Sequence, residues 1–400
     1  MSINKYFWIA FIYFFINSLG LPFGLTYTAL LSPLFYWWVL VTRKKEIILP
    51  FFSILLPYFL IHYYLGIMTK EYIVSLLNLA TVYIFCQAFY TFLKVCNDPE
   101  KIFRRIVIIN FILCLVAVPL YFTPFQELVW IKQYLTAGVN DFLRLKLFTY
   151  EASYYATLFT PLFVYFLLKI LFKQNKINAW LLLPMLFLPY ILSFALGVII
   201  SLLMAGTLLT VFYFKKLLRR KRIISLYLVF SVLGIIAILC VFLFFPDNTL
   251  FVRLENIISG KDSSSRGRTF EAFFLAGKLL EQKSQAWGIG LGQIKILGTN
   301  VIRDYYLYPA DYVISIPNAA AETLAIFGWV GLSIRILLEI FLFFYTKVWT
   351  NYYRLLLFFF IFIYQFTGSF ITNLAEYVIW ILVFTNCFPR FDVKQVSNGN

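Results

Sequence analysis

Charged residues are scarce in this sequence: 13% of the 400 residues are charged, whereas 62% are hydrophobic. Soluble globular chains carry about a quarter charged residues. The shortage excludes a water-facing exterior for most of the chain. Apolar runs recur from Tyr6 to about Phe388, and many approach the roughly 20 residues that a helix needs to cross a membrane. Little sequence remains for a soluble domain.

Histidine is nearly absent, and cysteine occurs without a metal-binding or redox pattern. His62 is the only histidine, which excludes a histidine-based metal site or triad, and we expect it to pack or to form hydrogen bonds. No DxD pair or His/Asp cluster occurs outside the apolar runs, so we expect no metal and no cofactor. The cysteines have no CxxC spacing, and we expect all five to be buried: Cys86, Cys96, Cys114, Cys240 and Cys387.

The apolar runs predict an all-α, polytopic membrane protein of about twelve transmembrane helices. The first run follows a single lysine and has no obvious cleavage site, so we expect a retained helix. The predicted helices are 6–22, 26–42, 47–64, 72–93, 106–124, 156–171, 178–192, 195–214, 223–245, 319–345, 355–372 and 375–389.

The placement of positive charge predicts the topology. The net charge is +16, and the basic clusters at 43–45, 101–105 and 215–222 fall on one side when alternate loops are placed on opposite sides. This side is cytoplasmic by the positive-inside rule, so the charge indicates orientation and not a nucleic-acid partner. Both termini are then inside. The predicted units are a membrane domain at 1–245 (with a shorter outer loop at 125–155), a large periplasmic loop at 246–318, a membrane domain at 319–389 and a cytoplasmic tail at 390–400.

The large loop is the main candidate for function, because crossing a membrane needs only short connections. Residues Thr269 to Gln282 predict an amphipathic helix that lies along the membrane surface, with Phe270, Phe273 and Phe274 on one side. Ser263, Ser264 and Ser265 are N-cap candidates. Arginines beside such a helix start favour a phosphate, although they could instead bind lipid headgroups or solvate the loop. The glycines of Trp287–Gly292 predict a tight turn and are by themselves a weak phosphate signal.

Ionisable residues near the predicted helix ends fall into two groups. Most lie at the outer mouth: Arg144, Lys146, Glu151, Glu322 and Glu376. Arg335 and Glu339 instead lie towards the inner end of helix 319–345 with i,i+4 spacing, which predicts a local, structural ion pair. The outer group surrounds an entrance rich in tyrosine and tryptophan, which suits a sugar diphosphate, but aromatic residues are also common at membrane interfaces.

Three segments between 144 and 332 together resemble the O-antigen polymerase and ligase superfamily. Arg144 to Ser153 is similar to the family's Arg and Glu-Pro-Ser pattern, with Ala152 in place of the proline. The run at 265–268 and the glycine turn after it resemble the arginine-bearing outer loop. The third segment, Pro317-Asn318 to Glu322 followed by 326–332, looks like the exit of that loop into a helix.

Two departures favour a Wzy-type polymerase over a ligase. Ligases typically have a histidine before the asparagine of the loop exit, where this sequence has Pro317. The helix near Ser193-Phe194 lacks the Ser-Arg pair of ligase-like members, and the spacing from Arg266 to Gly277 resembles an arginine motif of polymerases.

The resemblance implies an inner-membrane glycosyltransferase whose active site faces the periplasm. It would transfer a glycan from an undecaprenyl-diphosphate donor to the non-reducing end of a second lipid-linked repeat, and a chain-length regulator could be a further partner. The expected diphosphate contacts are Arg144, Arg266, Arg268 and Arg303, and Arg266 is also expected to act in catalysis. Glu151 and Glu322 are candidate bases, and Tyr150, Tyr154 and Asn318 are expected sugar contacts. The alternatives are a ligase or protein O-oligosaccharyltransferase, and a lipid-linked oligosaccharide flippase or other transporter.

Overall fold

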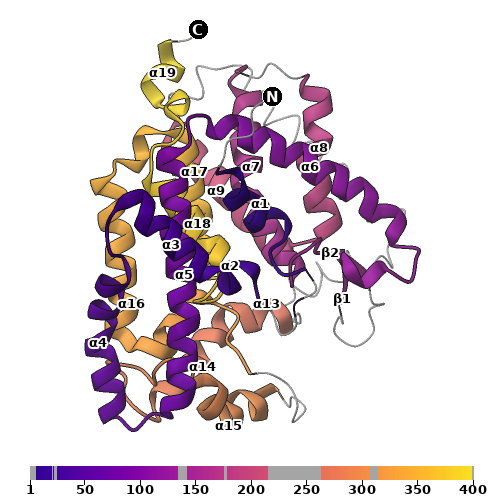
Figure 1. Cartoon of the computed structure of the whole chain (residues 1–400). Helices are drawn as coiled ribbons and strands as arrows, with labels where there is room; N and C mark the ends of the chain where they lie inside the picture. Colours follow the sequence, from indigo (N-terminus) through magenta and orange to yellow (C-terminus); the bar gives the residue numbers. More distant parts are fainter. Residues whose placement is uncertain are drawn as a thin grey trace.

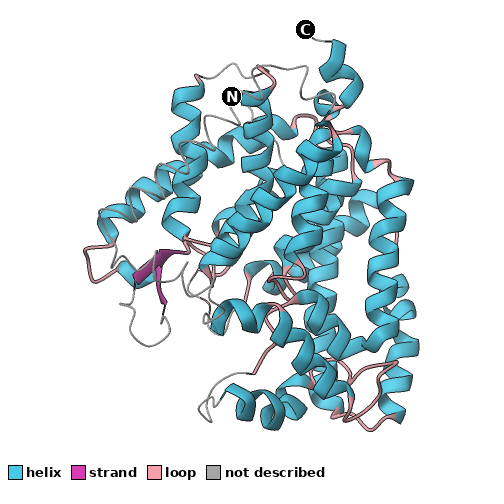
Figure 2. Cartoon of the chain, turned by 180° about the vertical axis from the view of Figure 1, so that it is seen from behind, coloured by secondary structure: helices cyan, strands magenta, loops and turns pink. Residues whose placement is uncertain are grey.

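A computed structural model of the chain describes residues 6–19, 21, 25–133, 142–174, 178–214, 263–306 and 314–398. Their regular secondary structure is helical apart from one pair of short strands, with turns and loops between the helices (Figures 1 and 2). The predicted all-α class is therefore confirmed for the described residues, whereas the predicted helix 223–245 lies outside them.

The first part of the chain forms α1 (Phe7–Phe15), α2 (Tyr27–Leu30), α3 (Ser32–Arg43), α4 (Ile48–Tyr64), α5 (Thr69–Val95), α6 (Pro99–Leu120), α7 (Ala152–Leu171), α8 (Ala179–Ser193) and α9 (Leu196–Phe212). The second part forms α13 (Ser263–Arg268), α14 (Phe270–Leu280), α15 (Ile294–Tyr306), α16 (Ala319–Tyr345), α17 (Tyr352–Tyr364), α18 (Leu374–Phe384) and α19 (Val393–Asn398). Single 3-10 turns lie at Gln126–Leu128, Val348–Thr350 and Pro389–Phe391.

Four described helices are long and apolar enough to cross a membrane: α5, α6, α7 and α16. Helices α3 and α4 meet at 120°, and together they make a fifth candidate span. The apolar helices α8, α9, α17 and α18 are shorter, with 11 to 17 residues. Four to five spans thus have the required length, and the count of twelve remains a prediction.

Helix α7 is the centre of the main helix bundle. In its most apolar window 89% of residues are buried, compared with 28% in α16. Helices α8, α17 and α18 pack against α7, and α9 packs against α17. Aromatic residues such as Phe159, Tyr165 and Phe360 fill the core between them. Helix α16 lies at the edge, where most of its outer surface carries exposed apolar side chains.

The prediction for the lone histidine is confirmed, and that for the cysteines holds for two of the four that the structure describes. His62 is buried, and its ring nitrogens form hydrogen bonds with the Trp287 carbonyl at 2.7 Å and the Tyr72 hydroxyl at 3.3 Å. Cys96 and Cys114 are buried. Two other cysteines, Cys86 and Cys387, are only partly buried, and Cys240 lies outside the described residues.

The predicted outer loop 125–155 contains an antiparallel hairpin. Strands β1 (Trp130–Gln133) and β2 (Phe142–Leu145) pair with Trp130 opposite Leu145. The Trp130 indole donates a hydrogen bond to the Ala117 carbonyl of α6 at 2.8 Å. The sequence had predicted only a loop here, so the hairpin is an addition to the all-α description.

The described part of the predicted large loop packs closely on the bundle instead of lying free. Ala272, Leu275 and Leu279 of α14 join a second apolar cluster with the start of α16. The Lys283 ammonium donates to the Leu65 and Gly66 carbonyls, and the Gln293 amide pairs with the backbone of Met68. Residues 263–306 are therefore fastened both to α16 and to the turn between α4 and α5, at the lower end of Figure 1.

Two details of the predicted amphipathic helix are corrected. Ser263, Ser264 and Ser265 belong to the separate short helix α13, and the N-cap of α14 is Thr269, whose side chain makes no capping bond. The α14 face that packs on the protein carries small and aliphatic residues, while Phe270 and Phe274 are exposed. Helix α15, which the sequence analysis did not predict, follows the glycine turn.

Helix α16 is broken at Gly328. Residues 285–290, which include the start of the glycine turn, form hydrogen bonds with the interrupted backbone. Gly328 has φ +67° and ψ −170°, which interrupts the helical hydrogen bonds. The turn supplies the missing partners: Ile289 N–H donates to the Ala325 carbonyl at 2.9 Å, and Trp329 N–H donates to the Gln285 carbonyl at 3.1 Å. Backbone groups that are buried without a partner are costly, so this exchange allows the break to persist.

We expect Gly328→Ala to lower the free energy of unfolding by about 1–3 kcal/mol through backbone strain alone. The overlap of the new Cβ with the Ala286 carbonyl should lower it further. Gly206→Ala is the matched control, since a Cβ there meets no atom within 4 Å and alanine favours a helix. Thermal unfolding of the detergent-purified variants measures both effects. Equal melting temperatures for the two variants would contradict the proposed role of the break.

Candidate functional site

Glu151 and Arg268 meet where α7 begins and α13 ends. Arg268 lies 3.9 Å from a carboxylate oxygen of Glu151, and their side chains are 32% and 35% exposed. The Ser153 hydroxyl donates to the same carboxylate oxygen at 2.5 Å and fixes its orientation. The structure thus joins a cation and a carboxylate from distant segments, and the loose contact leaves both open to a ligand.

Asn318 holds the backbone on the Arg268 side of this junction through buried hydrogen bonds. Its amide nitrogen donates to the carbonyls of Arg268 and Phe366, both at 2.7 Å. Its amide oxygen accepts from Ala321 N–H at 2.8 Å and caps α16. The side chain is fully buried. These contacts favour a structural role for Asn318 over the predicted sugar contact.

Arg266 lies on the solvent side of the same segment. Its side chain is 57% exposed and pairs with Glu271 at 2.8 Å. Glu271 is buried, and it also accepts a hydrogen bond from Tyr306 at 2.9 Å. Arg266 is therefore accessible to a ligand, but part of its charge is balanced within the protein.

Of the remaining predicted residues, Arg144 and Tyr154 are buried, whereas Lys146, Tyr150 and Arg303 are partly buried. Arg144 on β2 is buried and donates to the Ser193 carbonyl at 2.9 Å. Burial also lowers the pKa of the neighbouring Lys146, which Glu127 partly opposes. The rings of Tyr150 and Tyr154 lie 4.6 Å apart, and the Tyr154 hydroxyl accepts a hydrogen bond from Asn17. Arg303 lies in the last turn of α15.

Glu322 does not face the Glu151–Arg268 pair through any contact recorded among the described residues. One of its carboxylate oxygens accepts a hydrogen bond from Ile371 N–H at 2.6 Å. Ile371 lies in the connection between α17 and α18, which we call the α17–α18 loop (residues 365–373). The geometry favours Glu322 as a support for this loop over its predicted role as a base.

The sequence analysis missed a buried charge network around Arg335. The predicted pair with Glu339 is present at 3.2 Å, but Arg335 also bonds to Gln365 at 2.9 Å, to Thr323 at 3.0 Å and to Glu376. Glu376, which was predicted at the outer mouth, is 1% exposed. The ion pair is therefore not local: it connects α16 with the α17–α18 loop and with α18. The available signal was the presence of ionisable residues within apolar helices.

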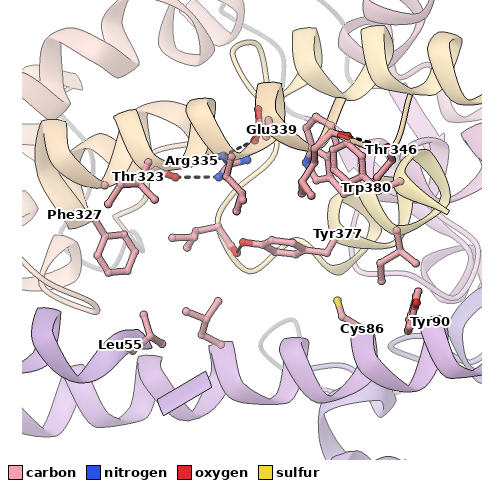
Figure 3. A pocket seen from close by; sticks show the side chains of 18 of the residues that line it. Leu55, Cys86, Tyr90, Thr323, Phe327, Arg335, Glu339, Thr346, Tyr377 and Trp380 are labelled. Carbon is pink, nitrogen blue, oxygen red and sulfur yellow. Dashed lines mark hydrogen bonds and ion pairs between the residues drawn. The ribbon is translucent and has the colours of Figure 1, made fainter. Parts of the chain in front are cut away.

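This network forms part of the wall of a cavity of about 660 Å³ (Figure 3). Leu55, Cys86 and Tyr90 line the cavity from α4 and α5, and Phe327 and Trp380 line it from the opposite side. Most of its lining is apolar. Arg335 and Glu339 supply charged groups near its middle, so the cavity suits a molecule that is largely hydrocarbon.

Comparisons with known proteins give no match: no family model, no curated protein and no solved structure is similar to this chain. The described residues contain no group of three or more His, Cys, Asp and Glu side chains that could hold a metal ion. The described residues are those of an α-helical protein with four to five helices apolar enough to cross a membrane and with a charged, partly exposed Glu151–Arg268 junction.

We expect Asn318→Asp to lower the free energy of unfolding by about 1–3 kcal/mol, because the new carboxylate would face two carbonyl oxygens and lose both donated hydrogen bonds. Asn178→Asp is the matched control: Asn178 is exposed and caps α8 through its side-chain oxygen, and aspartate caps a helix equally well. Thermal unfolding compares them. Equal stability of the Asn318→Asp and Asn178→Asp variants would argue against the structural role.

Proposed function

We propose that this protein is an inner-membrane glycosyltransferase that polymerises lipid-linked oligosaccharide repeat units. The observation that carries the proposal is the Glu151–Arg268 junction, because both residues belong to segments that resemble the O-antigen polymerase and ligase superfamily. Two motifs that are far apart in the sequence supply a carboxylate and a guanidinium to one partly exposed location.

The two side chains suit the two charge changes of glycan transfer. The bond from the donor sugar to the diphosphate breaks, and negative charge develops on the leaving diphosphate, which a fixed guanidinium stabilises most in the transition state. A bond forms from the same sugar carbon to the acceptor hydroxyl, whose proton passes to a carboxylate. We assign the first task to Arg268, assisted by exposed Arg266, and the second to Glu151, which Ser153 orients.

We further propose that the apolar cavity holds part of the donor's hydrocarbon chain. The residues of α5 that line it run from Leu79 to Tyr90, which at 1.5 Å per residue is roughly 16 Å along the helix, or about half the hydrocarbon thickness of a bilayer. The substrate would then be an undecaprenyl-diphosphate-linked oligosaccharide, with its glycan at the junction.

The orientation follows from the same proposal. The C-terminal helix α19 and helices α14 and α15 lie at opposite ends of the protein in Figure 1. We place both termini in the cytoplasm, residues 246–318 in the periplasm, and twelve helices in the membrane, in accord with the basic residues near 43–45 and 101–105.

A transporter of lipid-linked oligosaccharides is the second candidate, and one observation favours it. Transporters carry ionisable groups inside the bundle, and Arg335, Glu339 and Glu376 form such a group beside a large cavity. The gel profile of surface polysaccharide in a deletion strain separates the candidates. A single capped repeat unit supports the polymerase, loss of lipid-attached glycan supports a ligase, and cytoplasmic accumulation supports the transporter.

We expect Arg268→Ala to lower polymerisation in the complemented strain by roughly tenfold to a hundredfold, the effect of losing one charged hydrogen bond in the transition state. Arg268→Lys should restore only part of it, because lysine lacks the planar fork that grips a phosphate. Arg104→Ala, at an exposed position on α6, is the control and should leave long chains intact. Full-length polysaccharide from the Arg268→Ala variant at normal abundance would refute the diphosphate role.

We expect Glu151→Gln to lower polymerisation by about a hundredfold or more while membrane abundance stays near normal, because glutamine cannot accept the proton. Glu127→Gln changes an exposed carboxylate of the same predicted loop and is the matched control. Polysaccharide gels and immunoblots of the membrane fraction measure activity and abundance. A normal chain-length distribution from the Glu151→Gln variant would eliminate Glu151 as the base.

For topology, single cysteines in a cysteine-free background should react with an impermeant thiol reagent in intact spheroplasts at position 278 but not at position 45. Both lysines are exposed in the structure, so burial within the protein does not explain a difference. Labelling at 45 together with protection at 278 would reverse the proposed orientation. The predicted inside positions Lys216 and Arg220 lie outside the described residues.

A further inference from the structure

The α17–α18 loop supports the Glu151–Arg268 junction on two sides. On one side, Asn318 donates to the Phe366 carbonyl and to the Arg268 carbonyl, so it joins the loop to the arginine's own backbone. On the other, the Phe370 ring lies 6.2 Å from the ring of Tyr150, the residue before Glu151. A displacement of the loop would therefore move the backbone that carries Arg268 and the side chain beside Glu151.

The loop has a conformation that its own sequence does not favour. Ser369 has φ +67°, in the left-handed region that residues other than glycine seldom adopt. Side chains on α18 and just before it hold it there: the Ser369 hydroxyl donates to Glu376 at 2.5 Å and accepts from Asn373 at 2.8 Å. Such backbone strain persists only where the surroundings impose it, and it is common at functional sites.

Ionisable side chains hold the loop at three points. Gln365 at its start lies between Arg335, which donates to it at 2.9 Å, and Glu339, which accepts from it at 2.7 Å. Glu376 holds Ser369 in the middle, and Glu322 accepts from Ile371 N–H at 2.6 Å. Arg335 contacts both Glu339 and Glu376 and so links the first two points.

We propose that Arg335, Glu339 and Glu376 are positioning residues that set the geometry of Arg268 and Glu151 through the α17–α18 loop. The inference rests on the proposed function of that junction. It also explains why charges are buried here, because a buried ion network is a poor source of stability compared with apolar packing, whereas its directional bonds fix one arrangement. The network thus acts at a distance and does not touch the substrate's reacting atoms.

A double-mutant cycle tests the connection. Gln365→Leu keeps the approximate side-chain volume but removes both bonds to the network, and we expect it to lower polymerisation per unit of membrane protein about tenfold. In an Arg268→Ala background the same change should cost clearly less than tenfold, about threefold, because one of the two groups that the loop positions is already absent. Full additivity of the two losses would overturn the proposal.

Arg354 provides a matched control for burial. Its side chain is buried, like most of the Arg335 side chain. Arg354 lies near the start of α17, at the end away from the α17–α18 loop. It donates to the Val383 carbonyl at 2.6 Å and the Thr346 carbonyl at 2.9 Å, and neither acceptor belongs to the loop. Lysine keeps the charge but loses the fork at either site.

We expect Arg335→Lys and Arg354→Lys to lower the melting temperature similarly and only Arg335→Lys to lower polymerisation per folded protein. An equal loss of polymerisation in both would contradict the positioning role.

A labelling experiment separates failure of this inference from failure of the proposed function. In a cysteine-free background, Phe370→Cys reports the loop directly, and we expect its reaction rate with a maleimide to rise severalfold with Glu376→Gln but not with Arg354→Lys. An unchanged rate with Glu376→Gln overturns the positioning role whatever the protein's activity is. If the rate rises but the Arg268→Ala variant polymerises normally, the network does support the loop, and the function proposed for the junction is wrong.

Discussion

The positions of the glycine turn, α14 and α13 depend on one constraint, the pairing of backbone groups across the break in α16. A helix that stops and restarts at Gly328 leaves carbonyls and N–H groups that an apolar environment cannot satisfy. Residues 285–290 satisfy them, which fixes the glycine turn against α16 and, through α14, sets the position of α13. Arg268 reaches Glu151 because this chain of contacts brings it there.

Hydrophobic runs predicted the long helices well and the irregular backbone poorly. The predicted helix 319–345 has the same bounds as α16, and 72–93 falls within α5. The break at Gly328 escaped prediction, because a glycine in an apolar run carries no local sign that a distant segment will replace its hydrogen bonds. Helix α15 and the β1–β2 hairpin were missed for a related reason: in a loop that packs on a bundle, tertiary contacts decide the structure.

For the candidate site, residue types were predictable but partners were not. Glu151 and Arg268 were both chosen from the sequence, whereas Arg335 and Glu339 were dismissed as a local pair because their spacing explains one contact. Glu376 completes that network from another helix, and no periodicity within α16 or α18 reveals it. Asn318 shows the converse: its position in a family-like motif suggested a ligand contact, while its geometry shows three bonds within the protein.

The broken helix also bears on the order in which the protein is assembled. Residues 285–290 precede α16 in the chain, so the segment that pairs with the break is synthesised before the break itself. Backbone groups left unpaired at such a break are costly in an apolar environment. The glycine turn, which is held on the turn between α4 and α5, is therefore available to pair with the break as soon as α16 has been synthesised.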